Sequence, residues 1–211
     1  MATLTKAATV SFSALLLAAC GTTRNYVDHP ALAVVPPSET PREAVDAIFS
    51  GPTPLYVSLC NASRSTKECL PGDSGITARG LGGPLLPLKL QVRGIRVSNV
   101  QRDAGNFAFS GAFDSKVNAI TPLCGSSHVQ ASYGNDGSLS LRFGKFYCNW
   151  LLIGNVIVSA DFSIDSVSVK DRTLTGFYRL TFRGTGNAAG SGYFKAAIAP
   201  DASGAVRSAS N

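Results

Sequence analysis

Alternation of apolar and polar residues dominates the chain from residue 88 onward. Leu88, Leu90 and Val92 alternate with charged or amide side chains. The same pattern recurs at residues 107–113, 129–133, 139–143, 156–164, 174–182 and 193–198. Because successive side chains of a strand point to opposite faces, this period predicts about seven to nine strands, each with one buried face. The alternation slips by one residue at Gly94, which predicts a bulge or kink there.

Turn signals separate these segments and complete the prediction of fold class. The chain contains 21 Gly and 11 Pro, and only 15% of its residues are charged. Asn135-Asp136-Gly137 and Lys170-Asp171-Arg172 read as tight turns, and residues 71–87 as a long Gly/Pro loop with an apolar centre. The sequence predicts a mainly β domain with one short N-terminal α-helix, either an antiparallel β-sandwich or an up-and-down β-barrel. It does not separate these two architectures.

The one helix is predicted just before the strands. Thr40-Pro41-Arg42-Glu43 reads as a capping box with proline at the first helical position, and Gly51 follows the end. Apolar residues at helical spacing form a face that should dock on the domain. These residues are Ala44, Val45, Ile48 and Phe49.

The beginning of the chain reads as an export signal. Lys6 precedes a run of about ten apolar residues at 10–19, which is too short to span a bilayer as a helix. Leu17-Ala18-Ala19-Cys20 resembles the lipobox of bacterial lipoproteins. The resemblance implies a diacylglycerol on the Cys20 sulfur, cleavage before Cys20 and acylation of the new amino terminus, such as with palmitate. Two or three acyl chains hold a protein stably on a membrane.

These features divide the chain and predict its location. Residues 1–19 are expected to be the signal peptide, 20–40 a lipidated flexible tether, 41–200 a single β domain and 201–211 a disordered tail. Gly21 after the lipidated cysteine favours the outer membrane of a Gram-negative host, with the domain facing the periplasm or the cell surface. A protein tethered there is not expected to bind nucleic acid.

Four cysteines remain in the domain, at Cys60, Cys69, Cys124 and Cys148. An even number in an exported protein predicts two disulfides. Three connectivities are possible, and proximity along the chain favours Cys60 with Cys69 and Cys124 with Cys148. With no C-x-x-C pair and two histidines, a metal site is not expected.

A basic stretch precedes Asp103 and comprises Arg79, Lys89, Arg93, Arg96 and Arg102. One interpretation is attraction to an anionic surface such as lipid headgroups. The favoured interpretation is a solvated strand face.

Catalytic chemistry finds little support in the sequence. His128 is the only histidine outside the tether, and no G-x-S-x-G turn accompanies it. Asp161 and Asp165 share a strand face but read as a solvated pair rather than as an acid and a base. The glycine-rich segment 184–192 precedes a strand instead of the helix that a phosphate loop needs, so it is interpreted as a flexible hairpin connection. No catalytic residue, cofactor or metal is predicted.

The sequence therefore predicts a non-enzymatic envelope lipoprotein that binds an apolar or amphiphilic ligand, or a partner protein. Inward-facing aromatics support it, although filling of the core explains them more simply. These aromatics are Phe107, Phe109, Phe113, Tyr133, Phe143, Phe162, Tyr178 and Phe182. One alternative is a structural or assembly subunit of an envelope complex that uses an edge strand or the Leu81 to Leu86 loop. A weaker one is a hydrolase that uses His128.

Overall fold

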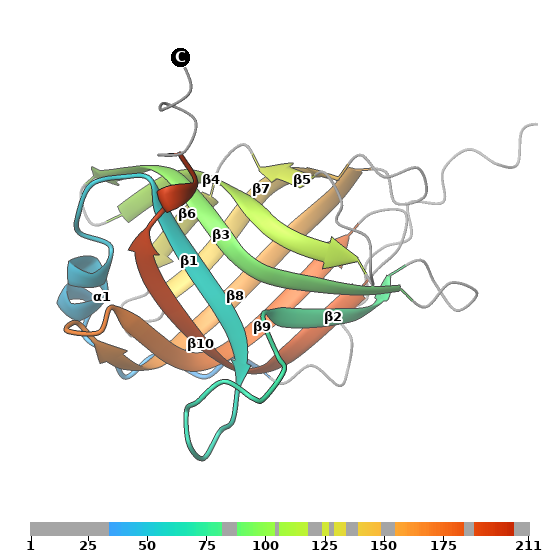
Figure 1. Ribbon diagram of the computed structural model, residues 1–211, viewed down its shortest axis with the longest axis horizontal. Coiled ribbons are helices and arrows are strands. Elements are labelled where there is room, and N and C mark those ends of the chain that lie inside the picture. Colours follow the sequence, from blue (N-terminus) through green and yellow to red (C-terminus); the bar gives the residue numbers. More distant parts are fainter. Residues whose placement is uncertain are drawn as a thin grey trace, which may run out of the picture.

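A computed structural model describes the chain from Val34 to Gly204 with several gaps (Figure 1). The described residues are 34–81, 88–103, 106–117, 124–126, 129–133, 139–148, 155–183 and 188–204. Their side chains are described at 34–79, 89–102, 109–116, 159–181 and 189–203. The leader, with Cys20, lies outside the described residues.

One short helix precedes ten strands in this part of the chain. The elements are α1 (Arg42–Ile48), β1 (Leu55–Ala62), β2 (Ile76–Leu81), β3 (Leu88–Asp103), β4 (Asn106–Val117), β5 (Cys124–Ser126), β6 (Val129–Tyr133), β7 (Leu139–Cys148), β8 (Asn155–Ser168), β9 (Thr173–Arg183), β10 (Ala188–Pro200) and the 3₁₀ turn η1 (Ala202–Gly204). The prediction of a mainly β domain with one N-terminal helix is confirmed.

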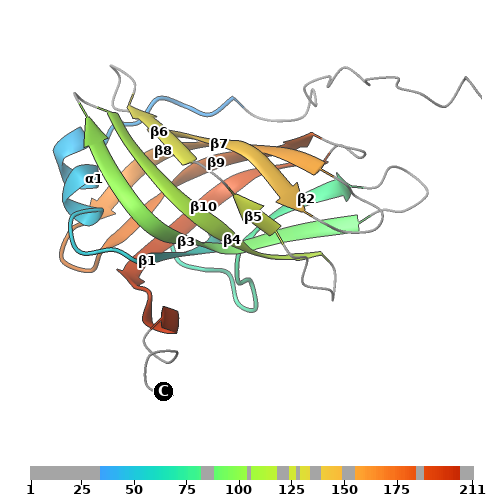
Figure 2. The ribbon, with the colours of Figure 1, turned by 90° about the horizontal axis from the view of Figure 1, so that it is seen from above.

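The pairing of the strands closes the sheet into a barrel (Figures 1 and 2). From β6 to β10 each strand pairs antiparallel with the next, β3 pairs with β4, and β4 pairs with β6. The ring closes through β1, which pairs antiparallel with both β10 and β3. Of the two predicted architectures, these pairings select the up-and-down barrel.

At two positions around the barrel, two short strands pair with different segments of the same long strand. β1 pairs with residues 94–97 of β3, and β2 continues along residues 88–92 of the same strand. β5 and β6 likewise both pair with β7. The expectation of a loop at 71–87 is wrong for residues 76–81, which form β2. Of residues 76–79, whose side chains are described, Ile76 and Ala78 are buried, a pattern too short for its period to stand out.

The predicted alternation places apolar side chains inside the barrel. Buried residues recur at every second position on β3 and β8–β10, as at Ala160, Phe162 and Ile164. The predicted irregularity at Gly94 is confirmed, because the β3–β4 register shifts between Val92 and Gly94. A Cβ at Gly94 would lie 2.6 Å from the Val57 carbonyl oxygen, so glycine lets β1 approach β3 closely.

Helix α1 lies at one end of the barrel (Figure 2). Val45, Ile48 and Phe49 are buried, and the Phe49 ring stacks on Phe109 with the ring centroids 6.3 Å apart. The predicted docking face is therefore largely correct. Ala44 is only partly buried.

The predicted capping box is wrong. The N-cap residue is Pro41, and no side chain caps the helix. Instead, the Thr40 hydroxyl donates a hydrogen bond of 3.0 Å to the carbonyl oxygen of Ile164, and Ser38 donates one of 2.5 Å to the same atom. This carbonyl lies where the β8–β9 register shifts, so tertiary contact with β8 takes the hydroxyl that the local motif would have used. Residues 38–40 of the expected tether are consequently docked on the domain.

The ordered structure also continues beyond Pro200, into the expected tail. The amide of Asp201 donates a hydrogen bond of 2.9 Å to the Pro54 carbonyl oxygen, and its carboxylate lies 3.8 Å from Arg96. Hydrogen bonds from Ser203 lower the pKa of Asp201. Across the described segments, no helix has the length and apolar character needed to cross a membrane.

Candidate ligand-binding site

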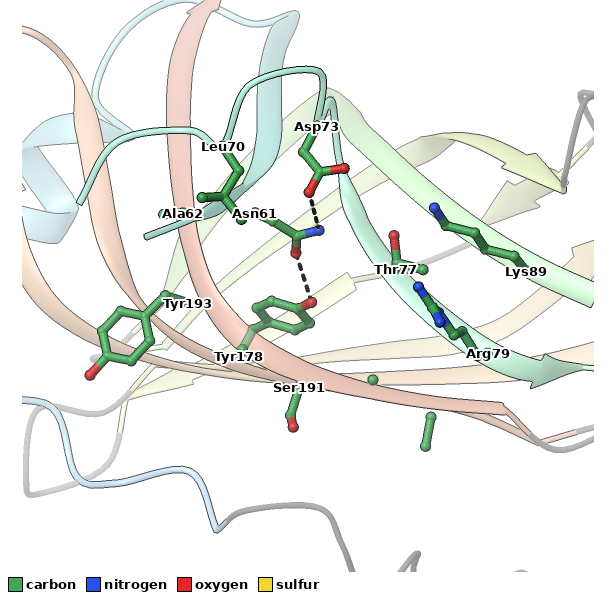
Figure 3. Close-up of a pocket in the computed structure, with 13 residues that line it drawn as sticks. Asn61, Ala62, Leu70, Asp73, Thr77, Arg79, Lys89, Tyr178, Ser191 and Tyr193 are labelled. Carbon is green, nitrogen blue, oxygen red and sulfur yellow. Dashed lines mark hydrogen bonds between the residues drawn. The ribbon is translucent and has the colours of Figure 1, made fainter. Parts of the chain in front are cut away.

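A pocket of about 450 Å³ opens where β1, β2 and β10 meet (Figure 3). β10 pairs with β1 as far as Tyr193 and meets β2 only at Ala189. Between these two points lie Gly190 and Gly192. A Cβ at Gly190 would lie 2.0 Å from the Thr77 carbonyl oxygen, so glycine lets β10 approach β2 closely there. The pocket therefore lies where β10 passes from its pairing with β1 to its pairing with β2. We call it the wall pocket.

A chain of hydrogen bonds forms the floor of the wall pocket (Figure 3). The Tyr178 hydroxyl donates to the side-chain oxygen of Asn61 at 2.9 Å, and the Asn61 amide nitrogen donates to Asp73 at 3.3 Å. Burial raises the pKa of the Tyr178 phenol, and the charge of Asp73 raises it further, against a backbone hydrogen bond from Thr77. Tyr178 thus keeps a neutral hydroxyl at the floor of the pocket.

The two sides of the wall pocket differ in chemistry. Ala62, Leu70 and Tyr193 form an apolar side, and Leu70 remains 42% exposed although it is a large apolar residue. Arg79 and Lys89 lie on the other side, opposite each other in the β2–β3 register (Figure 3). One pocket therefore offers both an apolar surface and two cationic groups.

A disulfide anchors the apolar side. Cys60 and Cys69 are bonded, with their Cα atoms 5.6 Å apart, and close the loop between β1 and β2. The Leu70 amide donates to the Asn61 carbonyl oxygen at 2.9 Å, which sets Leu70 beside the floor. Lys195 on β10 holds the same loop through an ion pair of 2.6 Å with Glu68.

The other predicted cysteine pair is described by its backbone only. Cys124 on β5 lies opposite Cys148 on β7 in the antiparallel register. Their side chains lie outside the described residues, so the bond between them stays a prediction.

The structure divides the basic stretch into two groups. Arg93 forms an ion pair with Asp114, and Arg96 lies beside Asp201. Arg102 donates to the Asp46 carbonyl oxygen at 3.0 Å, which links β3 to α1. These three residues contact neighbouring segments of the fold, whereas Arg79 and Lys89 line the wall pocket.

Other candidates from the sequence do not join this site. Asp161 lies 2.9 Å from Arg179, and Asp165 lies 3.4 Å from Lys67 and accepts a hydrogen bond from Thr175. Each carboxylate thus has a basic partner of its own, as expected for a solvated strand face. His128 lies outside the described residues.

The glycine-rich segment 184–192 is not simply a hairpin connection. Strand β10 begins at Ala188, so residues 188–192 belong to the sheet and border the wall pocket. The remainder, 184–187, lies outside the described residues.

The interior next to α1 is filled rather than hollow. A void of about 20 Å³ remains there, bordered by Phe49, Phe162 and Phe194, and it could hold no more than about one water. Phe162 and Phe194 meet edge to face with their centroids 4.8 Å apart. In this half of the barrel the aromatics fill the core. Phe107, Tyr133, Phe143 and Phe182 have side chains outside the described part of the chain.

Sequence reasoning missed most of the pocket. The sequence pattern places Tyr178 among the core aromatics and does not single out Asn61. The usable signal is the pair Arg79 and Lys89, of which Arg79 lies within the Gly/Pro-rich segment 71–87 and Lys89 follows it. Comparison of the chain with protein-family models, curated proteins and solved structures finds no match in any of the three. The proposal of a function therefore rests on the geometry of the wall pocket.

Proposed function

We propose that the protein is a lipid-anchored, non-enzymatic binding module of the bacterial cell envelope, and that its wall pocket holds an amphiphilic ligand. The observation that carries this proposal is the two-sided lining of the pocket. Leu70 and Tyr193 offer apolar contact, while Arg79 and Lys89 offer charge across a space of about 450 Å³. Ligand sites in proteins commonly have volumes of roughly 300 to 1,000 Å³, with a few placed polar groups.

The packing of the barrel favours the wall pocket over the interior as the binding site. The interior beside α1 has room for about one water. A ligand in the wall pocket needs no rearrangement of that core. The disulfide between Cys60 and Cys69 supports a preformed site, since it fixes the loop that carries Leu70.

The leader sequence supports the proposed location of the protein at a membrane. The lipobox at residues 17–20 would fix the chain to a membrane, with the outer membrane favoured by Gly21. A pocket on a tethered domain meets lipids and their precursors at high local concentration. We favour ligand capture over the alternative of an assembly subunit, because the wall pocket offers a cavity of a size common for small-molecule sites.

Native mass spectrometry of the full chain, released from non-ionic detergent micelles, tests this function. We expect an adduct with the mass of an amphiphile. Ser191 is exposed and lines the pocket, so Ser191→Trp should fill it and remove the adduct. Ala197→Trp is the matched control, because Ala197 is an exposed residue of β10 outside the pocket. A chain without any adduct, or an adduct that Ser191→Trp retains, would contradict the proposal.

A further inference from the structure

We propose that the floor of the wall pocket binds a pair of neighbouring hydroxyl groups of a sugar, held by Asn61 and Asp73. This inference rests on the proposed function, because it names the polar group of the amphiphile that the pocket would hold. The hydroxyl groups can belong to the sugar headgroup of a lipid or to a free sugar, which share the same chemistry.

The hydrogen-bonding groups of Asn61 and Asp73 are only partly used within the protein. The Asn61 side-chain oxygen accepts from Tyr178, and the Asn61 amide nitrogen donates to Asp73. Among the described residues, no other donor reaches the Asp73 side chain. A carboxamide has a second N–H, and a carboxylate has a second oxygen. A donor and an acceptor thus lie side by side at the floor of the pocket (Figure 3).

A hydroxyl group matches this arrangement, because it donates one hydrogen bond and accepts another. Two neighbouring hydroxyl groups of a sugar ring can donate to the second oxygen of Asp73 and accept from the second N–H of Asn61. Hydrogen bonds to a carboxylate are stronger than those between neutral groups. Thr77 and Ser191 add hydroxyl groups to the lining, which can bond to further hydroxyl groups of the ring.

The floor is held in place by contacts within the protein. Tyr178 is 3% exposed, and a backbone hydrogen bond from Thr77 holds its hydroxyl. Because that hydroxyl donates to the Asn61 oxygen, it turns the amide nitrogen toward Asp73. The backbone amide of Asp73 donates in turn to the Leu70 carbonyl oxygen at 3.0 Å. A ligand therefore has few groups to order when it binds, which favours affinity.

The charges around the pocket favour a neutral group at the floor. Arg79 is exposed and lines the same pocket, so its guanidinium would repel an ammonium group that approached Asp73. An anionic group at the floor would meet the Asp73 carboxylate instead. Hydroxyl groups avoid both repulsions. The apolar side at Leu70 remains for the hydrocarbon chain of the ligand.

Binding assays on the full chain test the inference in micelles of lauryldimethylamine oxide, a detergent without hydroxyl groups. The probes are hexyl glucoside, hexyl galactoside and hexyl mannoside, whose hydroxyl pairs differ in orientation, together with the corresponding free sugars. Hexyl tetraethylene glycol ether is the reference, because it has the same alkyl chain with ether oxygens in place of the sugar. At least one hexyl glycoside should bind about tenfold more tightly than this reference.

Substitutions of Asp73 show whether the floor makes the difference. Asp73→Ala should weaken binding of that glycoside about tenfold and leave binding of the reference ether unchanged, which also shows that the pocket is intact. Asp73→Asn keeps an acceptor oxygen and should weaken binding less. Asp171→Ala removes the same group at the exposed β8–β9 turn and should leave both affinities unchanged.

The outcomes separate this inference from the proposed function. Tighter binding of the glycoside than of its free sugar, with the preference over the ether lost in Asp73→Ala, supports a lipid headgroup as the source. Equal binding of the two, also lost in Asp73→Ala, supports a free sugar. If the ether binds as tightly as every glycoside, or if Asp73→Ala changes nothing, the sugar is wrong while the amphiphile-binding function survives. If no probe binds the unaltered chain, both proposals fail.

Discussion

The phenolic hydroxyl of Tyr178 on β9 donates a hydrogen bond of 2.9 Å to the side-chain oxygen of Asn61, which lies 117 positions earlier at the end of β1. Asn61 adjoins the disulfide cysteine Cys60 and passes the chain of hydrogen bonds on to Asp73. One bond thus joins the inside of the barrel, the disulfide loop and the floor of the wall pocket. Its strength is open to measurement.

Tyr178→Phe should lower the free energy of unfolding by about 1 kcal/mol, since it removes the donor and leaves the Asn61 oxygen without it. Urea unfolding followed by circular dichroism measures the change. Tyr193→Phe is the control, because no hydrogen bond joins the Tyr193 hydroxyl to a described residue, and its midpoint should stay in place. Equal effects of the two substitutions would show that the bond to Asn61 contributes nothing.

The fold was largely predictable from sequence. A barrel strand with one buried face alternates apolar and polar residues, and this alternation can be read from neighbouring positions. Gly94 marked the register shift for the same local reason. The wall pocket was not predictable, since it depends on which part of β10 pairs with β1 and which with β2. Likewise, the capping prediction failed at Thr40 because a carbonyl 124 positions away takes its hydroxyl. Contacts across such separations leave no local pattern.

Gly94→Ala should destabilise the barrel by about 1 to 3 kcal/mol, the usual range for overpacking. The added Cβ would lie 2.6 Å from the Val57 carbonyl oxygen and 2.6 Å from the Tyr56 hydroxyl. Gly192→Ala is the matched control, because its Cβ would meet the Tyr178 ring at an ordinary 3.4 Å. Thermal unfolding should therefore separate the two variants. Similar melting temperatures would contradict the close approach of β1 to β3.

Two buried serines should respond to alanine with opposite signs. Ser115 is 3% exposed, and its hydroxyl has no hydrogen-bond partner among the described residues, so Ser115→Ala should stabilise the chain by about 1 kcal/mol. Ser38 is 5% exposed and donates to Ile164, so Ser38→Ala should destabilise it by a similar amount. Urea midpoints measure both. A loss of stability in Ser115→Ala would mean that its hydroxyl has a partner in solution.

Alkaline pH should weaken the fold through Tyr56. Burial, together with a hydrogen bond of 2.8 Å to Asp114, raises the pKa of Tyr56 from 10.0 to about 12. The folded chain therefore holds this proton more tightly than the unfolded chain, so the stabilisation is complete below pH 10 and is lost as pH rises toward 12. Unfolding midpoints measured from about pH 9 upward should fall less steeply in Tyr56→Phe. Identical slopes would contradict the raised pKa.

The disulfide between Cys60 and Cys69 should affect both stability and binding. Its cysteines are 9 positions apart, and closing so short a loop stabilises a chain by about 2 to 3 kcal/mol on the chain-entropy model. The double variant Cys60→Ser with Cys69→Ser should lose that amount in urea unfolding. It should also lose amphiphile adducts in native mass spectrometry, because Leu70 and Asn61 flank the bond and line the wall pocket. Retention of the adducts would show that the pocket keeps its shape without the bond. A peptide map of the unreduced, unaltered chain should show the peptides of Cys60 and Cys69 linked, which establishes the bond that the double variant removes. The same map should show Cys124 linked to Cys148.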